Sequence, residues 1–213
     1  MRAGLALTAL LLVHPLFAQH EHHEHAADLG NLGTVHFATS CNVAAQANFT
    51  RGVALIHSFW YSEAEKSFRK AAADDPTCGI AWWGVAMSNY HPVWAAPTPD
   101  ELKTGADAAA KAKEVGAKTD GERDYIGAIN AFYSGTGDHA SRAAAYESAM
   151  EKVATAYPKD DEASIFYALS LLGTASPNDK TYTKQKKAAE ILGIERRTLY
   201  NKAKRLGIDF SKT

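Results

Sequence analysis

The chain has 213 residues, of which 46% are hydrophobic, and a formal net charge of -1 at pH 7. This composition is typical of one or two globular domains with a hydrophobic core, and it excludes a wholly disordered chain. The charge is unevenly divided: residues 180–213 carry ten Lys or Arg and three Asp or Glu, whereas residues 1–179 carry 13 and 21. We therefore expect a basic C-terminal segment suited to phosphate, attached to an acidic body that nucleic acid would repel.

Residues 1–18 have the layout of a secretory signal peptide. Arg2 precedes an apolar run from Ala3 to Val13, and Ala18 is the small residue after which we expect cleavage. The alternative is an uncleaved apolar terminus. The run is too short for a stable transmembrane anchor, so a cleaved signal predicts a periplasmic or secreted protein without a membrane anchor.

Residues 19–40 form a His-rich linker in this interpretation. Dense neutral imidazoles can bind Zn, Cu or Ni loosely, but a linker does not fix the geometry of ligands. We expect a solvated linker, with no dedicated metal site and no cofactor. The weak metal candidates are His20, His22, His23 and His25.

The two cysteines, Cys41 and Cys78, are separated by 37 residues. In an exported protein they could form a disulfide, since the separation is close to one period of the repeat described next. Two small buried thiols are the equal alternative.

From about Cys41 the apolar residues recur at helical spacing, first in a hairpin of two helices that ends at Pro76. When Ala45 is taken as the first position of a 34-residue unit, small residues, aromatic residues and a proline occupy positions 8, 17, 20, 24, 27 and 32. These residues are Gly52, Tyr61, Ala64, Phe68, Ala71 and Pro76. A second unit that begins at Gly79 places Trp82 at position 4 and Ala86 at position 8. This pattern resembles the tetratricopeptide repeat.

Beyond the proline-containing segment "HPVWAAPTP", further helices are predicted at about 100–115, 120–134, 140–157 and 160–173. Residues 33–192 resemble a group of bacterial exported tetratricopeptide-like proteins. The resemblance implies an all-α fold, a tetratricopeptide-like stack of helical hairpins (an α-solenoid) over residues 41–179. The concave face of such a stack is expected to hold a peptide or partner protein.

The body contains no sequence motif of a common catalytic site. It has no Gly-rich phosphate loop and no nucleophile elbow, and His57, His91 and His139 have no second ligand at metal spacing. We therefore predict that the protein is not an enzyme. The aromatic stretches "HSFWY" (57–61) and "WW" (82–83) fit either core packing or an aromatic ligand groove.

The segment 186–208 predicts two short helices separated by a turn. The first helix has an apolar side from Ala188 to Leu192, Gly193 supplies the turn, and Ile194 fills the corner. The second helix turns Leu199, Ala203 and Leu206 inward and ends at Gly207. This is the arrangement of a helix-turn-helix, whose second helix enters the major groove of DNA.

Residues 187–208 closely resemble the Fis-type helix-turn-helix of NtrC-class activators. We assign the whole basic segment, residues 180–213, to this helix-turn-helix. By resemblance, Arg196, Thr198 and Lys202 contact DNA. Arg and Asn suit base edges, while Lys and Thr suit phosphates. The full set of candidates is Arg196, Arg197, Thr198, Tyr200, Asn201, Lys202, Lys204 and Arg205. Fis-type domains normally have two earlier helices, and the polar stretch "TASPNDKTYTKQK" provides neither.

Two functions from different classes follow. The first is a helical-repeat protein that binds duplex DNA through its basic end, which requires a cytoplasmic location. The second is an exported tetratricopeptide-like interaction scaffold whose terminal helix-turn-helix is a fusion remnant. The DNA motif is the more specific signal, whereas the signal peptide supports export.

Overall fold

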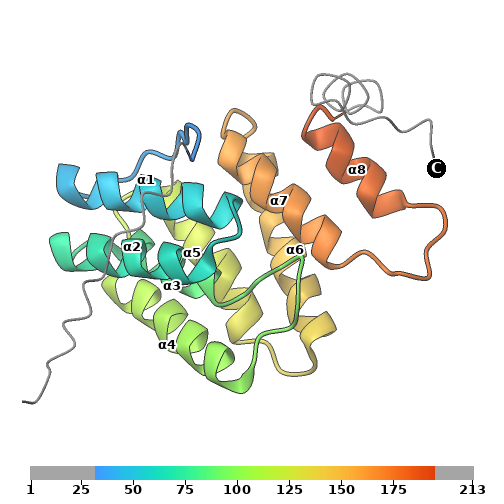
Figure 1. The fold of residues 1–213 in the computed structure, drawn as a ribbon, viewed down its shortest axis with the longest axis horizontal. Helices are drawn as coiled ribbons and strands as arrows, with labels where there is room; N and C mark the ends of the chain where they lie inside the picture. Colours follow the sequence, from blue (N-terminus) through green and yellow to red (C-terminus); the bar gives the residue numbers. More distant parts are fainter. Residues whose placement is uncertain (1–31, 195–213) are drawn as a thin grey trace, which may run out of the picture. The chain divides into compact units, whose positions relative to one another are not determined.

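The computed structural model of the chain, drawn in Figure 1, describes residues 32–194. This part of the chain is all-helical and contains no strand, which confirms the predicted fold class. Its eight helices are α1 Val43–His57, α2 Tyr61–Asp74, α3 Gly79–Ser88, α4 Pro99–Val115, α5 Asp120–Tyr133, α6 His139–Ala156, α7 Asp161–Gly173 and α8 Thr183–Ile191.

The helices pack as a stack of antiparallel hairpins. Each helix contacts the next one along the chain, from α1 to α8. In addition, α3 contacts both α1 and α5, so the first helices of successive hairpins also lie against each other. A stack of helical hairpins was predicted from the sequence; the tetratricopeptide identity of its units stays a prediction.

Local signals in the sequence explain where several helices begin. Thr98 and Thr119 each form a capping box with the glutamate three residues later, and Pro99 occupies the first position of α4. Asp160 accepts hydrogen bonds from the first backbone N–H groups of α7. Gly116 ends α4 with a φ of +77°, which a residue with a side chain rarely adopts.

The core between the first two hairpins is built around Phe68, which is fully buried. Its ring lies against Gly52 of α1 and Gly84 of α3, where an added Cβ would come within 2.6 Å and 2.2 Å of ring atoms. Glycine is needed at both positions because the ring fills the space that a side chain would take. Trp83 and Phe49 complete this aromatic core.

The segment before α1 is tied to helices that are distant in sequence. Cys41 and Cys78 form a disulfide with a Cα–Cα distance of 5.1 Å, so of the two alternatives open at the sequence level the structure contains the bonded one. The Ser40 N–H and hydroxyl donate to the buried Glu122 carboxylate at 2.7 Å to its nearest oxygen in each case. Phe37 is buried among these helices, with its ring 5.0 Å from that of Phe49.

None of the helices within residues 32–194 combines the length and apolar character needed to cross a bilayer.

Candidate nucleic-acid interface

The first helix of the expected helix-turn-helix is α8, and a polar turn sets its start. The Asp179 carboxylate accepts hydrogen bonds from the N–H groups of Thr181 at 2.8 Å and Thr183 at 3.2 Å. Bonds from the Thr181 side chain and backbone, in that order, lower the pKa of Asp179. Tyr182, which precedes the helix, has a φ of +57° and a half-exposed side chain. The turn therefore redirects the chain before α8 begins.

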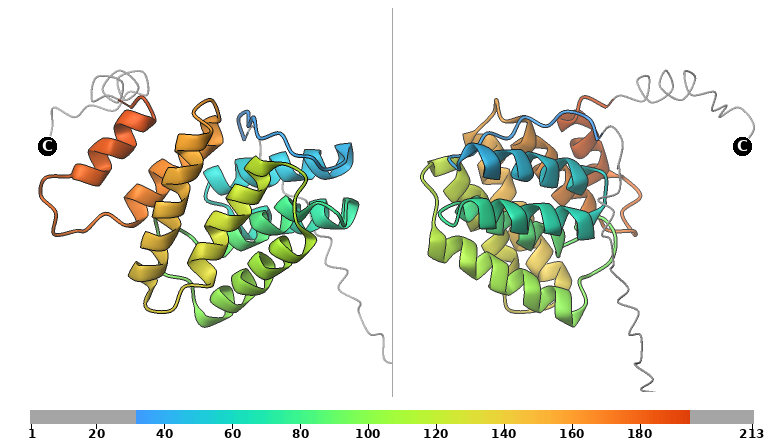
Figure 2. Two further views of the ribbon diagram at one scale, coloured as in Figure 1. Left: turned by 180° about the vertical axis from the view of Figure 1, so that it is seen from behind. Right: turned by 60° about the vertical axis from the view of Figure 1, so that its left-hand side comes forward.

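One face of α8 packs against α7. Ala188 is 1% exposed, α8 contacts α7, and the left view of Figure 2 shows α8 at the end of the array. The first helix of the expected helix-turn-helix thus also packs as the second helix of the last hairpin. A short bihelical unit has little core of its own, and here the helical body supplies packing for α8.

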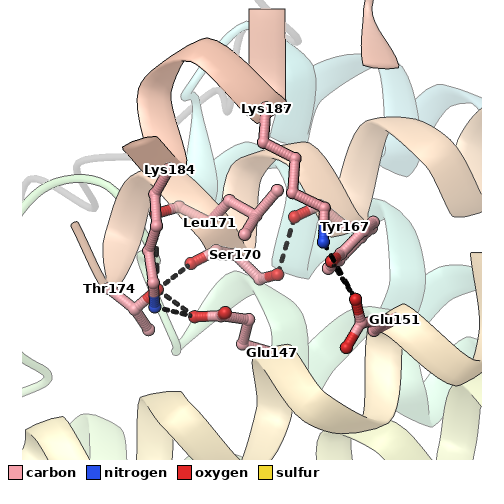
Figure 3. A network of polar contacts seen from close by, with 8 residues as sticks. All are labelled: Glu147, Glu151, Tyr167, Ser170, Leu171, Thr174, Lys184 and Lys187. Atoms are coloured by element: carbon pink, nitrogen blue, oxygen red, sulfur yellow. Dashed lines mark hydrogen bonds and ion pairs between the residues drawn. The ribbon is translucent and has the colours of Figure 1, made fainter. Parts of the chain in front are cut away.

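Lys184 connects the start of α8 to α6 and to the end of α7 (Figure 3). Its Nζ lies 2.6 Å from the Glu147 carboxylate and donates to the Thr174 hydroxyl at 2.8 Å. The Thr174 hydroxyl also donates to Glu147. Because the Glu147 side chain is only 18% exposed, its charge needs these partners.

Lys187, one turn later, makes a second set of contacts (Figure 3). Its Nζ lies 2.9 Å from Glu151 and 5.1 Å from the centre of the Tyr167 ring. The Tyr167 hydroxyl donates to the same Glu151 oxygen at 2.6 Å. These bonds, first from Tyr167 and then from Lys187, lower the pKa of Glu151, and the same two partners raise the pKa of Lys187. Two of the basic residues of the C-terminal segment are therefore engaged with the body.

The end of α8 is a Schellman motif. The Ile194 N–H donates to the Ala189 carbonyl at 2.8 Å, and the Gly193 N–H donates to the Glu190 carbonyl at 3.0 Å. Gly193 has a φ of +60°, which glycine adopts without steric penalty. The helix consequently stops at the position where the sequence predicts the turn, and Ile194 is exposed there.

All eight predicted DNA-contacting residues lie between Arg196 and Arg205, outside the described residues. The four weak metal candidates between His20 and His25 lie outside them as well. Within residues 32–194, no group of three or more His, Cys, Asp or Glu side chains is arranged to hold a metal ion. The DNA contacts predicted for residues 196–205 and the weak metal binding predicted for residues 20–25 therefore stay predictions.

The three scattered histidines of the body make separate contacts. His57 pairs with the buried Glu162 at 2.7 Å, His91 bonds the Ser88 carbonyl at 2.9 Å, and the His139 ring lies beside Tyr90. The structure does not bring these histidines together with one another.

The contacts of Lys184 and Lys187 were not anticipated from the sequence. Glu147 and Glu151 precede these lysines by 37 and 36 residues, and they lie on a different helix. The spacing of four between the two glutamates places them on one face of α6, and the spacing of three between the two lysines places them on one face of α8. These spacings do not indicate that the two faces meet.

Comparison with known protein families gives a match to a short part of the chain. Residues 184–206 match the family described as bacterial regulatory protein, Fis family. The match begins in α8, includes the turn at Gly193 and continues past the described residues. It supports the C-terminal helix-turn-helix and indicates DNA-binding capacity. No curated protein and no solved structure matches the chain.

Proposed function

We propose that the chain is a non-enzymatic helical-repeat protein whose segment 180–213 binds duplex DNA in a sequence-specific manner. The match of residues 184–206 to the Fis family is the observation that carries this proposal. The end of α8 at Gly193 supports it, because a helix-turn-helix requires a break at this position.

In this proposal some residues after the turn contact base edges and others contact the sugar-phosphate backbone. Arg196 and Arg197 at the start of the second helix and Asn201 one turn later read base edges, since Arg matches guanine and Asn matches adenine. Thr198, Lys202 and the remaining candidates, Tyr200, Lys204 and Arg205, contact the sugar-phosphate backbone.

In this proposal the repeat body fixes the position of the first helix of the motif. In a helix-turn-helix the first helix crosses the DNA backbone and must be held at a fixed angle to the second. Here α7 covers Ala188, while Glu147 and Glu151 pair with Lys184 and Lys187. We propose that these contacts take the place of the two helices that precede the motif in Fis-type domains. The concave face of the body is proposed to bind a partner protein.

The DNA proposal is tested by fluorescence anisotropy of labelled duplexes with the full chain over a series of salt concentrations. Affinity should fall steeply with salt, with a slope of about -0.9 for each phosphate contacted. The double substitution Arg196→Ala/Arg197→Ala should remove discrimination between duplex sequences. Lys103→Ala/Lys111→Ala removes the same charge from exposed positions on α4 and serves as the control. Equal effects of the two double substitutions would show that the second helix does not read DNA.

A second function is favoured by the disulfide between Cys41 and Cys78. Structural disulfides form in oxidising compartments and are rare in the cytosol. Together with the N-terminal signal pattern, this bond supports an exported interaction scaffold. In such a protein the C-terminal segment has no DNA-binding role, because it lies outside the cytoplasm. N-terminal analysis and cell fractionation separate the two: a chain that begins at Gln19 in the periplasm supports the scaffold, and retention of Met1 in the cytoplasm supports the DNA role.

A further inference from the structure

Exposed aromatic side chains gather at one place on the body. Phe59 and Trp60, in the turn between α1 and α2, are each 45% exposed, and Trp94, in the long green connection from α3 to α4 in Figure 1, is 69% exposed. The Phe59 and Trp94 rings meet edge to face, with centroids 5.4 Å apart. These three residues, here called the aromatic patch, are half of the six large apolar side chains exposed within residues 32–194. The other aromatic stretch differs, because Trp83 is buried.

Tyr61 and His91 pack beside the patch and support it. Tyr61 lies under it, with its ring 4.5 Å from that of His91, and burial raises the pKa of Tyr61 to about 12. The Trp94 backbone N–H donates to the His91 carbonyl at 3.2 Å, and the Trp94 ring lies against that of Phe59. Trp94 is thus held by its backbone and by Phe59, while its ring stays exposed to a partner. A rigid exposed aromatic ring loses little conformational entropy on binding.

The backbone under the patch is in an unfavourable conformation. The α1 helix ends in a Schellman motif, in which Phe59 N–H donates to Ile56 and Trp60 N–H donates to Leu55, both at 2.9 Å. Phe59, with a φ of +60°, occupies the position that glycine normally takes in this motif. His91, beside Tyr61, has a φ of +51°. Such strain in bulky residues is found at ligand-binding sites, since folding alone would favour glycine there.

The surroundings of the patch are acidic. The first turns of α2 and α4 contain Glu63, Asp100 and Glu101 and no basic residue. Glu63 pairs with Lys66 at 3.0 Å, and Glu101 accepts hydrogen bonds from Thr98 and lies 3.8 Å from His91, which leaves Asp100 to meet an incoming charge. Backbone hydrogen bonding at the start of α4 lowers the pKa of Glu101 and keeps it ionised. Residues 32–179 as a whole carry 12 Lys or Arg and 18 Asp or Glu.

We propose that the aromatic patch docks a cationic segment of a partner protein. Arginine or lysine side chains of the partner stack on the exposed ring of Trp94, where the ring quadrupole attracts positive charge. The same side chains pair with Asp100.

The test uses the full isotope-labelled chain and follows the Trp94 indole signal by NMR during titration with a short Gly-Ser peptide that carries two arginines. The same peptide with citrulline, the neutral isostere of arginine, isolates the effect of charge. Trp94→Leu keeps an apolar side chain but removes the aromatic face, and Asp100→Asn removes a charge. Tyr182→Leu changes an exposed aromatic residue outside the patch and is the matched control.

The arginine peptide should bind about two- to fivefold more weakly to Trp94→Leu, the fold-change that corresponds to one exposed cation–π contact. Asp100→Asn should weaken it about twofold at low salt, and Tyr182→Leu should have no effect. Equal binding of the arginine and citrulline peptides overturns the cationic partner. Unchanged binding to Trp94→Leu overturns the docking surface. None of these measurements involves DNA, so they fail or succeed independently of the proposed function.

Discussion

Lys187 of α8 lies 2.9 Å from Glu151 of α6 and above the ring of Tyr167, which bonds the same carboxylate. This contact joins the segment that matches a DNA-binding family to the helical stack. It shows that α8 belongs structurally to the stack, even though the family match begins within it. The body therefore holds α8 up to its end at Gly193.

Replacement of both carboxylates, Glu147→Gln/Glu151→Gln, should loosen α8 without unfolding the stack. The exposed Lys187–Glu151 pair contributes about 0.2–1 kcal/mol and the partly buried Lys184–Glu147 pair at least as much, so the backbone amides of α8 should exchange with solvent at least about two- to fivefold faster for each lost pair. Hydrogen exchange read by mass spectrometry measures this change. Glu114→Gln, which removes an exposed carboxylate paired within α4, is the control and should leave α8 unaffected. Uniform loss of protection across all helices would contradict the assignment.

Gly193 should tolerate asparagine better than alanine. An L-residue with a side chain at this φ costs about 1–2 kcal/mol, and asparagine is the residue that accepts the conformation best after glycine. Gly193→Ala should therefore extend or distort the end of α8 and weaken DNA binding by about tenfold, as measured by anisotropy. Gly193→Asn should keep most of the affinity. If alanine and asparagine behave alike, the left-handed turn is not required.

Reduction of the Cys41–Cys78 disulfide should destabilise the first two hairpins. The bond closes a loop with a sequence separation of 37, for which the chain-entropy relation gives about 4 kcal/mol. The free energy of unfolding in urea, compared with and without dithiothreitol, measures the effect. Cys41→Ser/Cys78→Ser should reproduce the reduced value under both conditions. A midpoint that does not respond to dithiothreitol would show that the bond is dispensable.

Stability should depend on pH through Glu122. Burial acts to raise the pKa of Glu122, but hydrogen bonds from Ser40 and then Thr119 outweigh burial and place the pKa below 4.5. A lowered folded-state pKa means that this stabilisation is complete above about pH 4.5 and is lost as the pH falls through the folded value. Glu122→Gln should cost about 1–3 kcal/mol at pH 7 and flatten the acid limb of the stability profile. Glu114→Gln should leave that limb unchanged, and an equally steep limb in Glu122→Gln would refute the assignment.

The sequence was informative where structure depends on neighbouring residues. The predicted segments 100–115, 120–134, 140–157 and 160–173 differ from α4 to α7 by one residue at most at each end. Thr98 and Asp160 cap their helices through residues two or three positions away, and Gly116 ends α4 through its own conformation. Such signals are contained in short windows of sequence and can be recognised without the fold.

Contacts between distant segments could not be predicted in the same way. Glu122 bonds Ser40 across 82 residues, and His57 pairs with Glu162 across 105. Each pairing depends on how successive hairpins stack, and no local pattern encodes it. For the same reason the sequence left the state of the two cysteines open, and it did not indicate that α8 packs on α7.

The proposed function requires that the C-terminal segment discriminates between DNA sequences, and selection from a pool of random duplexes tests this directly. The full chain is incubated with the pool, bound duplexes are recovered and sequenced, and the enriched site is compared with a scrambled duplex. We expect one enriched sequence, bound about a thousandfold or more tighter than the scrambled duplex, with enrichment lost in Arg196→Ala/Arg197→Ala. Recovery of no common sequence, together with equal binding to every duplex, would contradict the claim.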